Sequence, residues 1–275
     1  MSYVISHPEV QLVLKLEKIE KLHVHEETID EIVEELRCEW KNTLTIRHPI
    51  MVDENTLVIL DGTHRLQTLK RMGCNLIPVC LVDYKNPGIK VKSWVRIAST
   101  AQGNMKNLPR DLEEWGYVFK KTTANELEDQ LRQRMAIGMK ILGDSYYLPQ
   151  NYKPIKKIYD TIKNLELDFK SNGYMISYAS EYHSTMNEAR TNGNAVIIPP
   201  LITKDDILNV TLCGDVFTPK STRHVFPARS LSVNVPVAWL FLTLEKANRL
   251  FLKKLSGKQY TYVKQPQNED LYLFQ

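Results

Sequence analysis

The chain has 275 residues, of which 43% are hydrophobic and 25% are charged, and these values are ordinary for a soluble globular protein. The 36 basic and 32 acidic residues nearly balance, so the net charge of +4 argues weakly against a dedicated nucleic-acid binder. The four cysteines show neither CxxC spacing nor a metal-ligand pattern, which together with the lack of a signal-peptide pattern predicts a reducing cytoplasm. No apolar run approaches the ~20 residues of a membrane span.

The first hundred residues predict alternating strands and helices. Leu12, Leu14 and Leu16 alternate with polar residues as in a strand with one buried face, and the following helix has apolar residues at helical spacing. The expected elements are a strand over Leu12–Ile19, a helix over Ile29–Trp40, a strand over Ile46–Val52, a strand ending at Asp61, a helix closed by Gly73, and strands over Ile77–Tyr84 and Lys90–Ala98.

The polar, glycine-containing segment Ser99–Leu108 predicts a domain boundary. Beyond it the pattern is again mixed, so the whole chain is expected to be an α+β protein with a second α+β domain. The expected helices cover Asp111–Tyr117, Asn125–Met135, Lys153–Asn164, Asp205–Cys213 and Pro236–Leu255, and the expected strands cover Gly138–Tyr147, Tyr174–Ala179 and Ala195–Ile198.

The most informative segment is TLVILDGTHRLQTLKRMG, residues Thr56–Gly73. It predicts a short apolar strand that passes through the pentapeptide Asp61–Arg65 directly into a helix. Such a turn points free backbone N–H groups and the positive end of the helix dipole at one place, which favours a phosphate. Gly62 permits close approach of the backbone, and Thr63 is a candidate helix cap. The alternative interpretation is a simple Asp-Gly turn followed by a solvated helix start.

The order strand, His25-Glu26, helix, strand, DGTHR, helix, strand resembles the N-terminal domain of the ParB/sulfiredoxin superfamily. With the segment GDVFTPKSTRH, residues 214–224, the chain is similar to the free L-serine kinases built on that fold, which phosphorylate the hydroxyl of the free amino acid. Ile46–Ile50 and the tail after Asn234 look more like the siderophore-associated bacterial branch. The resemblance implies a ParB/sulfiredoxin-like catalytic domain over residues 1–98, and a C-terminal domain over 99–275 that contributes the amino-acid carboxylate site.

The resemblance also implies roles for individual residues. Glu26 is the expected general base, although an acidic residue at a helix N-terminus is also favourable for the helix dipole alone. Asp61 is expected to bind Mg²⁺ or to assist proton removal. The nucleotide and its phosphates are expected to contact Gly62, Thr63, His64, Arg65, Arg47 and His48. The substrate serine is expected to contact Trp94, Ser221, Thr222, Arg223 and His224, with the guanidinium of Arg223 on its carboxylate.

Two relatives on the same scaffold give different expectations. A sulfiredoxin needs a nucleophilic cysteine in the turn, where this chain has Thr63, so the sequence argues strongly against that function. A ParB-type, nucleotide-switched DNA-binding protein remains the alternative, although the sequence shows neither an arginine-rich box nor a recognition helix. The sequence leaves open whether ATP or ADP is the donor, and it leaves the oligomeric state open. It also leaves open whether the acceptor is serine or another small hydroxy amino acid, since one methyl or methylene group is worth only ~1–3 kcal/mol.

Overall fold

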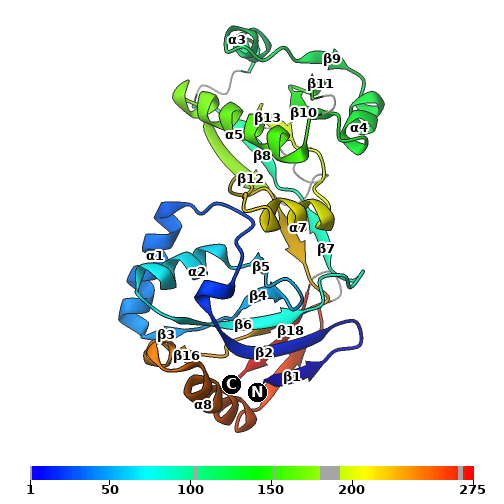
Figure 1. Ribbon diagram of the computed structural model, residues 1–275. Coiled ribbons are helices and arrows are strands. Elements are labelled where there is room, and N and C mark those ends of the chain that lie inside the picture. Colours follow the sequence, from blue (N-terminus) through cyan, green and yellow to red (C-terminus); the bar gives the residue numbers. More distant parts are fainter. Residues whose placement is uncertain (1, 102–104, 151–152, 180–192, 266–268) are drawn as a thin grey trace. The chain divides into compact units, whose positions relative to one another are not determined.

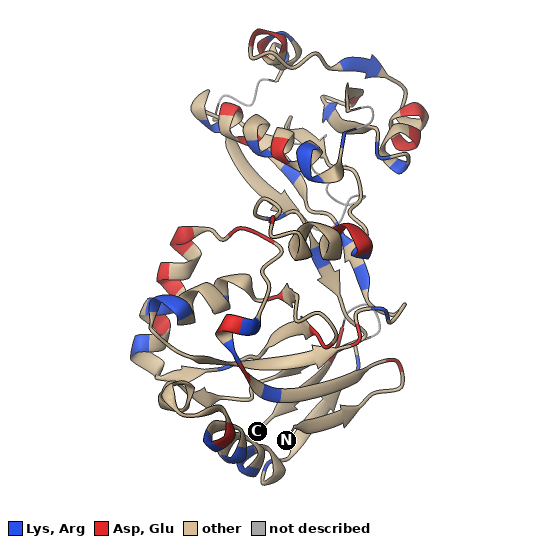
Figure 2. Cartoon of the chain, viewed as in Figure 1, with Lys and Arg blue, Asp and Glu red and all other residues tan. Residues whose placement is uncertain are grey.

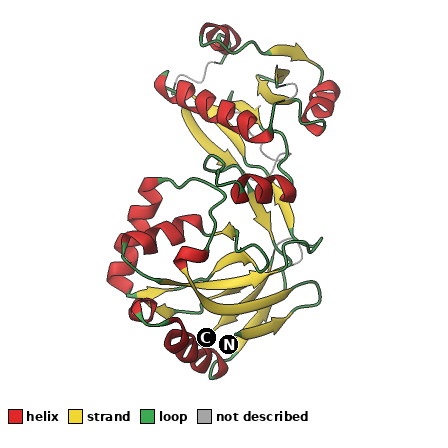
Figure 3. Cartoon of the chain, viewed as in Figure 1, coloured by secondary structure: helices red, strands yellow, loops and turns green. Residues whose placement is uncertain are grey.

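The computed structural model describes residues 2–101, 105–150, 153–179, 193–265 and 269–275, and this part of the chain contains both helices and strands (Figure 3). The chain forms two compact units. The first consists of Met1–Lys90, Ile207–Pro219 and His224–Gln275, and the second of Val91–Asp206 and Lys220–Arg223. This division differs from the predicted one at residue 98, because most of the chain after Asp206 returns to the N-terminal unit.

A five-stranded sheet forms the centre of the first unit, in the order β1-β2-β6-β4-β5 (Figure 1). Only β4 and β6 pair in parallel, and all seven residues of β6 are buried, as expected for a central strand. The strands are β1 (Tyr3–Ser6), β2 (Gln11–Lys18), β4 (Ile50–Asp53), β5 (Ile59–Asp61) and β6 (Leu76–Val82).

Further helices and strands complete the first unit, and several of them come from the C-terminal part of the chain. A three-stranded sheet has the order β15-β18-β17, and β16 pairs with β3. The helices are η1 (Ile19–Lys21), α1 (Asp30–Thr43), α2 (Thr63–Arg71), η2 (Val237–Phe241) and α8 (Leu244–Ser256). The additional strands are β3 (Thr45–Ile46), β15 (Ala228–Leu231), β16 (Val235–Pro236), β17 (Tyr260–Val263) and β18 (Asp270–Phe274).

A six-stranded sheet in the order β12-β8-β13-β10-β11-β9 forms the centre of the second unit. Its strands are β8 (Val95–Ser99), β9 (Lys120–Thr122), β10 (Ala136–Ile141), β11 (Asp144–Pro149), β12 (Met175–Ala179) and β13 (Ala195–Ile198). Its helices are α3 (Leu108–Glu114), α4 (Ala124–Arg132) and α5 (Ile155–Ser171). The elements β7 (Lys90–Lys92), α7 (Lys204–Leu212) and β14 (Arg223–Val225) each contain a point at which the chain changes unit.

Several predicted elements prove to be two elements rather than one. The expected strand over Ile46–Val52 is β3 followed by β4, and the break falls at Pro49, which has no N–H to donate to a sheet. The expected strand over Lys90–Ala98 is likewise divided into β7 and β8. The expected strand over Gly138–Tyr147 is the hairpin of β10 and β11, whose Leu142 and Gly143 both have positive φ, as a tight two-residue turn requires.

The expected last helix over Pro236–Leu255 is also interrupted. It consists of the 3-10 helix η2 and the α-helix α8, and Leu242 between them is extended, with φ −79° and ψ 172°. Thr243 is then the N-cap of α8. The prediction failed here because the apolar residues keep helical spacing through the break, so periodicity alone does not show it.

Charge is mixed along the surface helices, as the composition indicates. Figure 2 shows acidic and basic segments interspersed along α1. In the part of the chain that the structure describes, no helix is both long enough and apolar enough to span a membrane.

Candidate functional site

The predicted phosphate turn forms at the junction of β5 and α2. Gly62 is the N-cap of α2 in the left-handed region, with φ +107°, and Thr63 is the first helical residue. The prediction that Thr63 caps the helix is wrong, because Gly62 occupies the N-cap position and Thr63 is a buried residue of the helix itself. A Cβ atom at Gly62 would lie 2.3 Å from Cγ2 of Ile50, so this position excludes any larger residue without rearrangement.

Asp61, at the end of β5, is held by two arginines. Nη2 of Arg65 lies 3.1 Å from Oδ2 of Asp61, and Nη1 of Arg229 donates to the same oxygen. Arg65 also donates from Nη1 to the carbonyl oxygen of Pro49 at 2.6 Å. Burial disfavours ionisation of Asp61, but the two guanidinium groups outweigh it and hold the pKa of this carboxyl well below its usual range. Asp61 is therefore a carboxylate at neutral pH and a poor proton acceptor.

Arg229 is itself fixed by two residues that lie just before the strands β15 and β18. Its Nε donates to Oε2 of Glu269, and its guanidinium carbon lies 4.6 Å from the ring centroid of Phe226. Oε1 of Glu269 accepts a hydrogen bond from the backbone N–H of Phe226 at 2.8 Å. Asp61, Arg65, Arg229 and Glu269 are called the Asp61 cluster below. Two guanidinium groups face two carboxylates in it, so the cluster carries no net charge.

Glu26 lies in an extended segment that is pinned on both sides. Its backbone forms a parallel bridge with Phe217, whose N–H donates to the carbonyl of His25 at 2.8 Å. Nδ1 of His25 lies 2.5 Å from the carbonyl oxygen of Ile59 in β5, two residues before Asp61. Because a carbonyl oxygen only accepts, Nδ1 of His25 must carry a proton. The Glu26 side chain is 14% exposed, and its Oε1 lies 3.8 Å from Nε2 of His25.

His224 packs beside His25 in the interior of the first unit. The two rings lie edge to face with centroids 5.4 Å apart, and Nε2 of His224 is 2.8 Å from the hydroxyl of Tyr84. Burial, together with the neighbouring His25, holds the pKa of His224 well below its usual range. His224 is therefore neutral at pH 7 and offers no positive charge to a carboxylate.

The other predicted substrate contacts fall in the second unit, where they form a group around Trp94. The indole Nε1 of Trp94 donates to the carbonyl oxygen of Thr222 at 3.0 Å. The guanidinium carbon of Arg223 lies 5.6 Å from the ring centroid, and Nζ of Lys220 lies 5.2 Å from it. Ser221 and Thr222 are buried. The aromatic face thus orders two cations in this short segment.

The remaining predicted nucleotide contacts engage the backbone of neighbouring loops. His48 accepts a hydrogen bond at Nδ1 from the N–H of Ser232 at 3.1 Å, and burial with the charges of Arg65 and Arg47 lowers its pKa. His64 accepts at Nε2 from the N–H of Ile29, the N-cap of α1, at 3.0 Å. Arg47 is exposed. Both imidazoles act here as hydrogen-bond acceptors, which is the neutral form.

The donor set for a metal is small. Among the described residues, no group of three or more His, Cys, Asp and Glu side chains is placed to hold a metal ion. Mg²⁺ in phosphoryl-transfer sites is usually bound through one or two carboxylates together with substrate phosphates, and Asp61 beside the phosphate turn fits that arrangement. The two buried cysteines are poor nucleophiles, since burial raises the pKa of Cys80 to about 12 and that of Cys74 to about 11.

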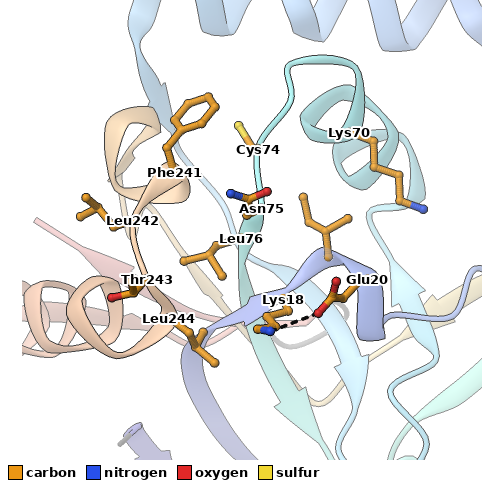
Figure 4. A pocket seen from close by; sticks show the side chains of 11 residues that line it. Lys18, Glu20, Lys70, Cys74, Asn75, Leu76, Phe241, Leu242, Thr243 and Leu244 are labelled. Carbon is orange, nitrogen blue, oxygen red and sulfur yellow. Dashed lines mark hydrogen bonds and ion pairs between the residues drawn. The ribbon is translucent and has the colours of Figure 1, made fainter.

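A cavity of about 680 Å³ lies at the opposite end of α2 (Figure 4). Lys70 of α2 and Phe241 of η2 contribute to its lining, and Lys18 there is paired with Glu20 at 3.1 Å. None of the predicted site residues lines it. The cavity is therefore distinct from the phosphate turn.

Sequence reasoning missed several residues of the site. Arg229 and Glu269 belong to no motif. Arg229 reaches Asp61, with Glu269 bound to Arg229, only because the C-terminal strands return to the first unit. Tyr84 ends the predicted strand over Ile77–Tyr84 without any signal of its own. His25 belongs to the predicted His25-Glu26 motif, but no sequence signal indicates that its ring packs against that of His224.

Comparisons with known proteins find similar sequences and a similar fold. The chain is 25% identical over 204 residues to the ADP-dependent L-serine kinase SerK of Thermococcus kodakarensis, and the matched region covers 74% of this chain and 79% of the relative. It is 24% identical over 221 residues to an ATP-dependent L-serine kinase of Desulfurococcus mucosus, covering 76% and 84%. The fold is similar to that of a free serine kinase variant solved in complex with AMP, with a TM-score of 0.70, 19% identity, and coverage of 87% and 97%. No family model matches the chain.

Proposed function

We propose that this protein is a free L-serine kinase, which transfers a phosphoryl group from ATP or ADP to the serine hydroxyl and produces O-phospho-L-serine. The observation that carries the proposal is the junction of β5 and α2. There a glycine-capped helix start lies directly after Asp61, and the segment that carries Glu26 is bonded to the same strand. The motif resemblance and the L-serine kinases among the relatives support the same activity.

The phosphate turn supplies the binding of the transferred group. The helix start presents backbone N–H groups and the positive end of the α2 dipole to a phosphate. Gly62 lets the phosphate approach this backbone closely, and Arg65 adds positive charge beside it. Thr63 lies in the first turn and contributes its backbone N–H. His64 and His48 position the loops around the turn, and Arg47 is exposed as a further cation.

Glu26 is the proposed general base. It accepts the proton of the serine hydroxyl as the serine oxygen forms its bond to phosphorus, while the bond from phosphorus to the leaving nucleotide oxygen breaks. The alternative base, Asp61, is a poor proton acceptor because its two arginines stabilise the ionised form. The proton therefore goes to Glu26, and Asp61 has an electrostatic role.

Mg²⁺ is the proposed metal. Asp61 would hold it together with the nucleotide phosphates, and the ion would neutralise part of their negative charge. Glu269 is the other carboxylate of the Asp61 cluster, and its two oxygens already accept hydrogen bonds from the Phe226 N–H and from Arg229. Asp61 is therefore the carboxylate proposed to hold the ion.

The group around Trp94 is the proposed site for the amino acid. The guanidinium of Arg223 matches a carboxylate with two parallel hydrogen bonds, and Trp94 limits the freedom of this side chain. Ser221 and Thr222 contribute polar backbone and hydroxyl groups from the same segment. His224 supports this segment as a neutral ring anchored to Tyr84, and it does not neutralise the carboxylate.

The proposal is tested by incubating the protein with Mg²⁺, ATP or ADP, and a panel of free amino acids. Phosphorus NMR and mass spectrometry then identify the product and the donor. O-phosphoserine from one of the two donors, with less product from threonine and homoserine, is the expected result. If no amino acid is phosphorylated and the protein instead protects a specific DNA duplex at high salt, the ParB-type alternative is favoured.

A further inference from the structure

We propose that Arg229 is a positioning residue for Asp61, which fixes the orientation of that carboxylate at the phosphate turn. The proposal concerns how the C-terminal strands complete the N-terminal site, and it rests on the proposed function for the role of Asp61. Arg229 acts through Asp61 and is not itself assigned a contact with substrate.

The contacts that carry this inference all converge on one oxygen atom. Arg65 and Arg229 both donate to Oδ2 of Asp61. Arg65 lies four residues from Asp61 in the sequence, whereas Arg229 lies 168 residues away. Within the described part of the chain, no hydrogen bond or ion pair engages Oδ1. Two donors on one oxygen prevent rotation of the carboxyl group, so Oδ1 keeps a constant direction.

Arg229 can serve this purpose because it is itself rigid. Its Nε is bonded to Glu269, its guanidinium lies over the ring of Phe226, and Glu269 is held in turn by the Phe226 N–H. Only 18% of the Arg229 side chain is exposed. An arginine that merely balanced surface charge would need neither the aromatic support nor the second carboxylate.

Charge gives a second consequence. The Asp61 cluster has no net charge, and removal of the Arg229 guanidinium leaves one excess negative charge beside the turn. This loss of charge weakens polyphosphate binding by a similar factor whether residue 61 is Asp or Asn, so only an additional loss in the presence of Asp61 reports positioning. Loss of orientation at Oδ1 adds a loss in turnover.

Arg71 provides a matched control. It also bridges two carboxylates in the first unit, Asp30 and Glu34, but 33% of its side chain is exposed and it lies at the C-terminal end of α2. Arg71→Gln removes the same chemical group from a similar pair of partners. It should leave nucleotide binding unchanged.

The test is a double-mutant cycle with Arg229→Gln, Asp61→Asn and the double variant. Its readouts are the dissociation constant of ADP with Mg²⁺, measured by calorimetry, and kcat for serine. We expect Arg229→Gln to weaken ADP binding by about tenfold more in the presence of Asp61 than when Asp61 is already Asn. Arg229→Lys should recover part of the loss, because it restores the charge but cannot bridge both carboxylates.

Equal losses from Arg229→Gln in both backgrounds would overturn the proposal, since Arg229 would then act independently of Asp61. Thermal unfolding of every variant identifies misfolding. If Arg229→Gln does not fold, the cycle is run with Arg229→Lys and with Glu269→Gln, which removes the support of Arg229 but keeps the acceptor for Phe226. Serine phosphorylation by the wild type is measured first. If it is absent the proposed function fails, whereas the ADP cycle still tests Arg229.

Discussion

Nδ1 of His25 donates its proton to the carbonyl oxygen of Ile59 across 2.5 Å, and this bond ties the Glu26 segment to the strand that ends in Asp61. His25 is buried, and the bond joins its ring directly to the backbone. The side chain of one motif residue thus connects two motifs that are 34 residues apart in the sequence.

His25→Ala should therefore reduce both stability and activity. The substitution leaves the buried carbonyl of Ile59 without its partner, which typically costs about 1–3 kcal/mol. Urea unfolding measures the loss, and the kinase assay measures the fall in kcat. His23→Ala is the matched control, because His23 is exposed and uses its backbone to bond with Leu57 and Ile59. Equal effects of the two substitutions would contradict the role assigned to His25.

Gly62→Ala should be much more harmful than Gly73→Ala. Both glycines have positive φ, at +107° and +73°, so alanine is strained at either position by on the order of 1 kcal/mol. Only at Gly62 would the new Cβ also collide with Ile50, since nothing lies within 4 Å at Gly73. Thermal melting and ADP binding should both separate the variants. Similar melting temperatures for the two would show that the turn is not as tightly packed as the structure indicates.

Stability should fall as the pH is lowered from 7 to 5, and His224 should contribute to this slope. Its pKa is below the unfolded value of about 6.5, so the unfolded chain binds a proton that the folded chain does not. The contribution is present above pH 6.5 and is lost at up to about 1.4 kcal/mol per pH unit as the pH falls below it. Unfolding of the wild type and of His224→Gln across this range measures the difference. His48 shifts in the same direction, so the slope should shrink in the variant and not vanish.

Arg223 should decide whether a carboxylate is required in the substrate. Serinamide and ethanolamine keep the hydroxyl but lack the negatively charged carboxylate. Loss of one partner of a desolvated charge pair commonly costs 2–5 kcal/mol, so their apparent affinity should fall about 30-fold to several-thousand-fold. Arg223→Lys should also be impaired, because an ammonium cannot form two parallel hydrogen bonds. Both effects should appear mainly in KM for serine. Serinamide reacting as well as serine in both proteins would remove Arg223 from the site.

The sequence predicted those parts of the fold that depend on neighbouring residues. The strand that becomes β2, the helices α1 and α2, and the turn at Gly62 follow from local periodicity and from the conformational freedom of glycine. The contacts of Arg229 with Asp61 and Glu269 depend on the return of the C-terminal strands to the first unit, which no local pattern encodes. The assignment of His224 as a neutral interior ring likewise depends on its burial against His25 and Tyr84.

The proposed base is tested most directly by the rate of O-phosphoserine formation in the wild type and in Glu26→Gln, at saturating serine and donor. The amide keeps the size of the side chain but cannot accept the proton, so the rate should fall by about 10²–10⁴-fold with ADP binding unchanged. Glu27→Gln, in which the backbone bond to Phe217 is kept, should remain near the wild-type rate. Near-normal turnover of Glu26→Gln, or the absence of O-phosphoserine from the wild type with either donor, would contradict the account.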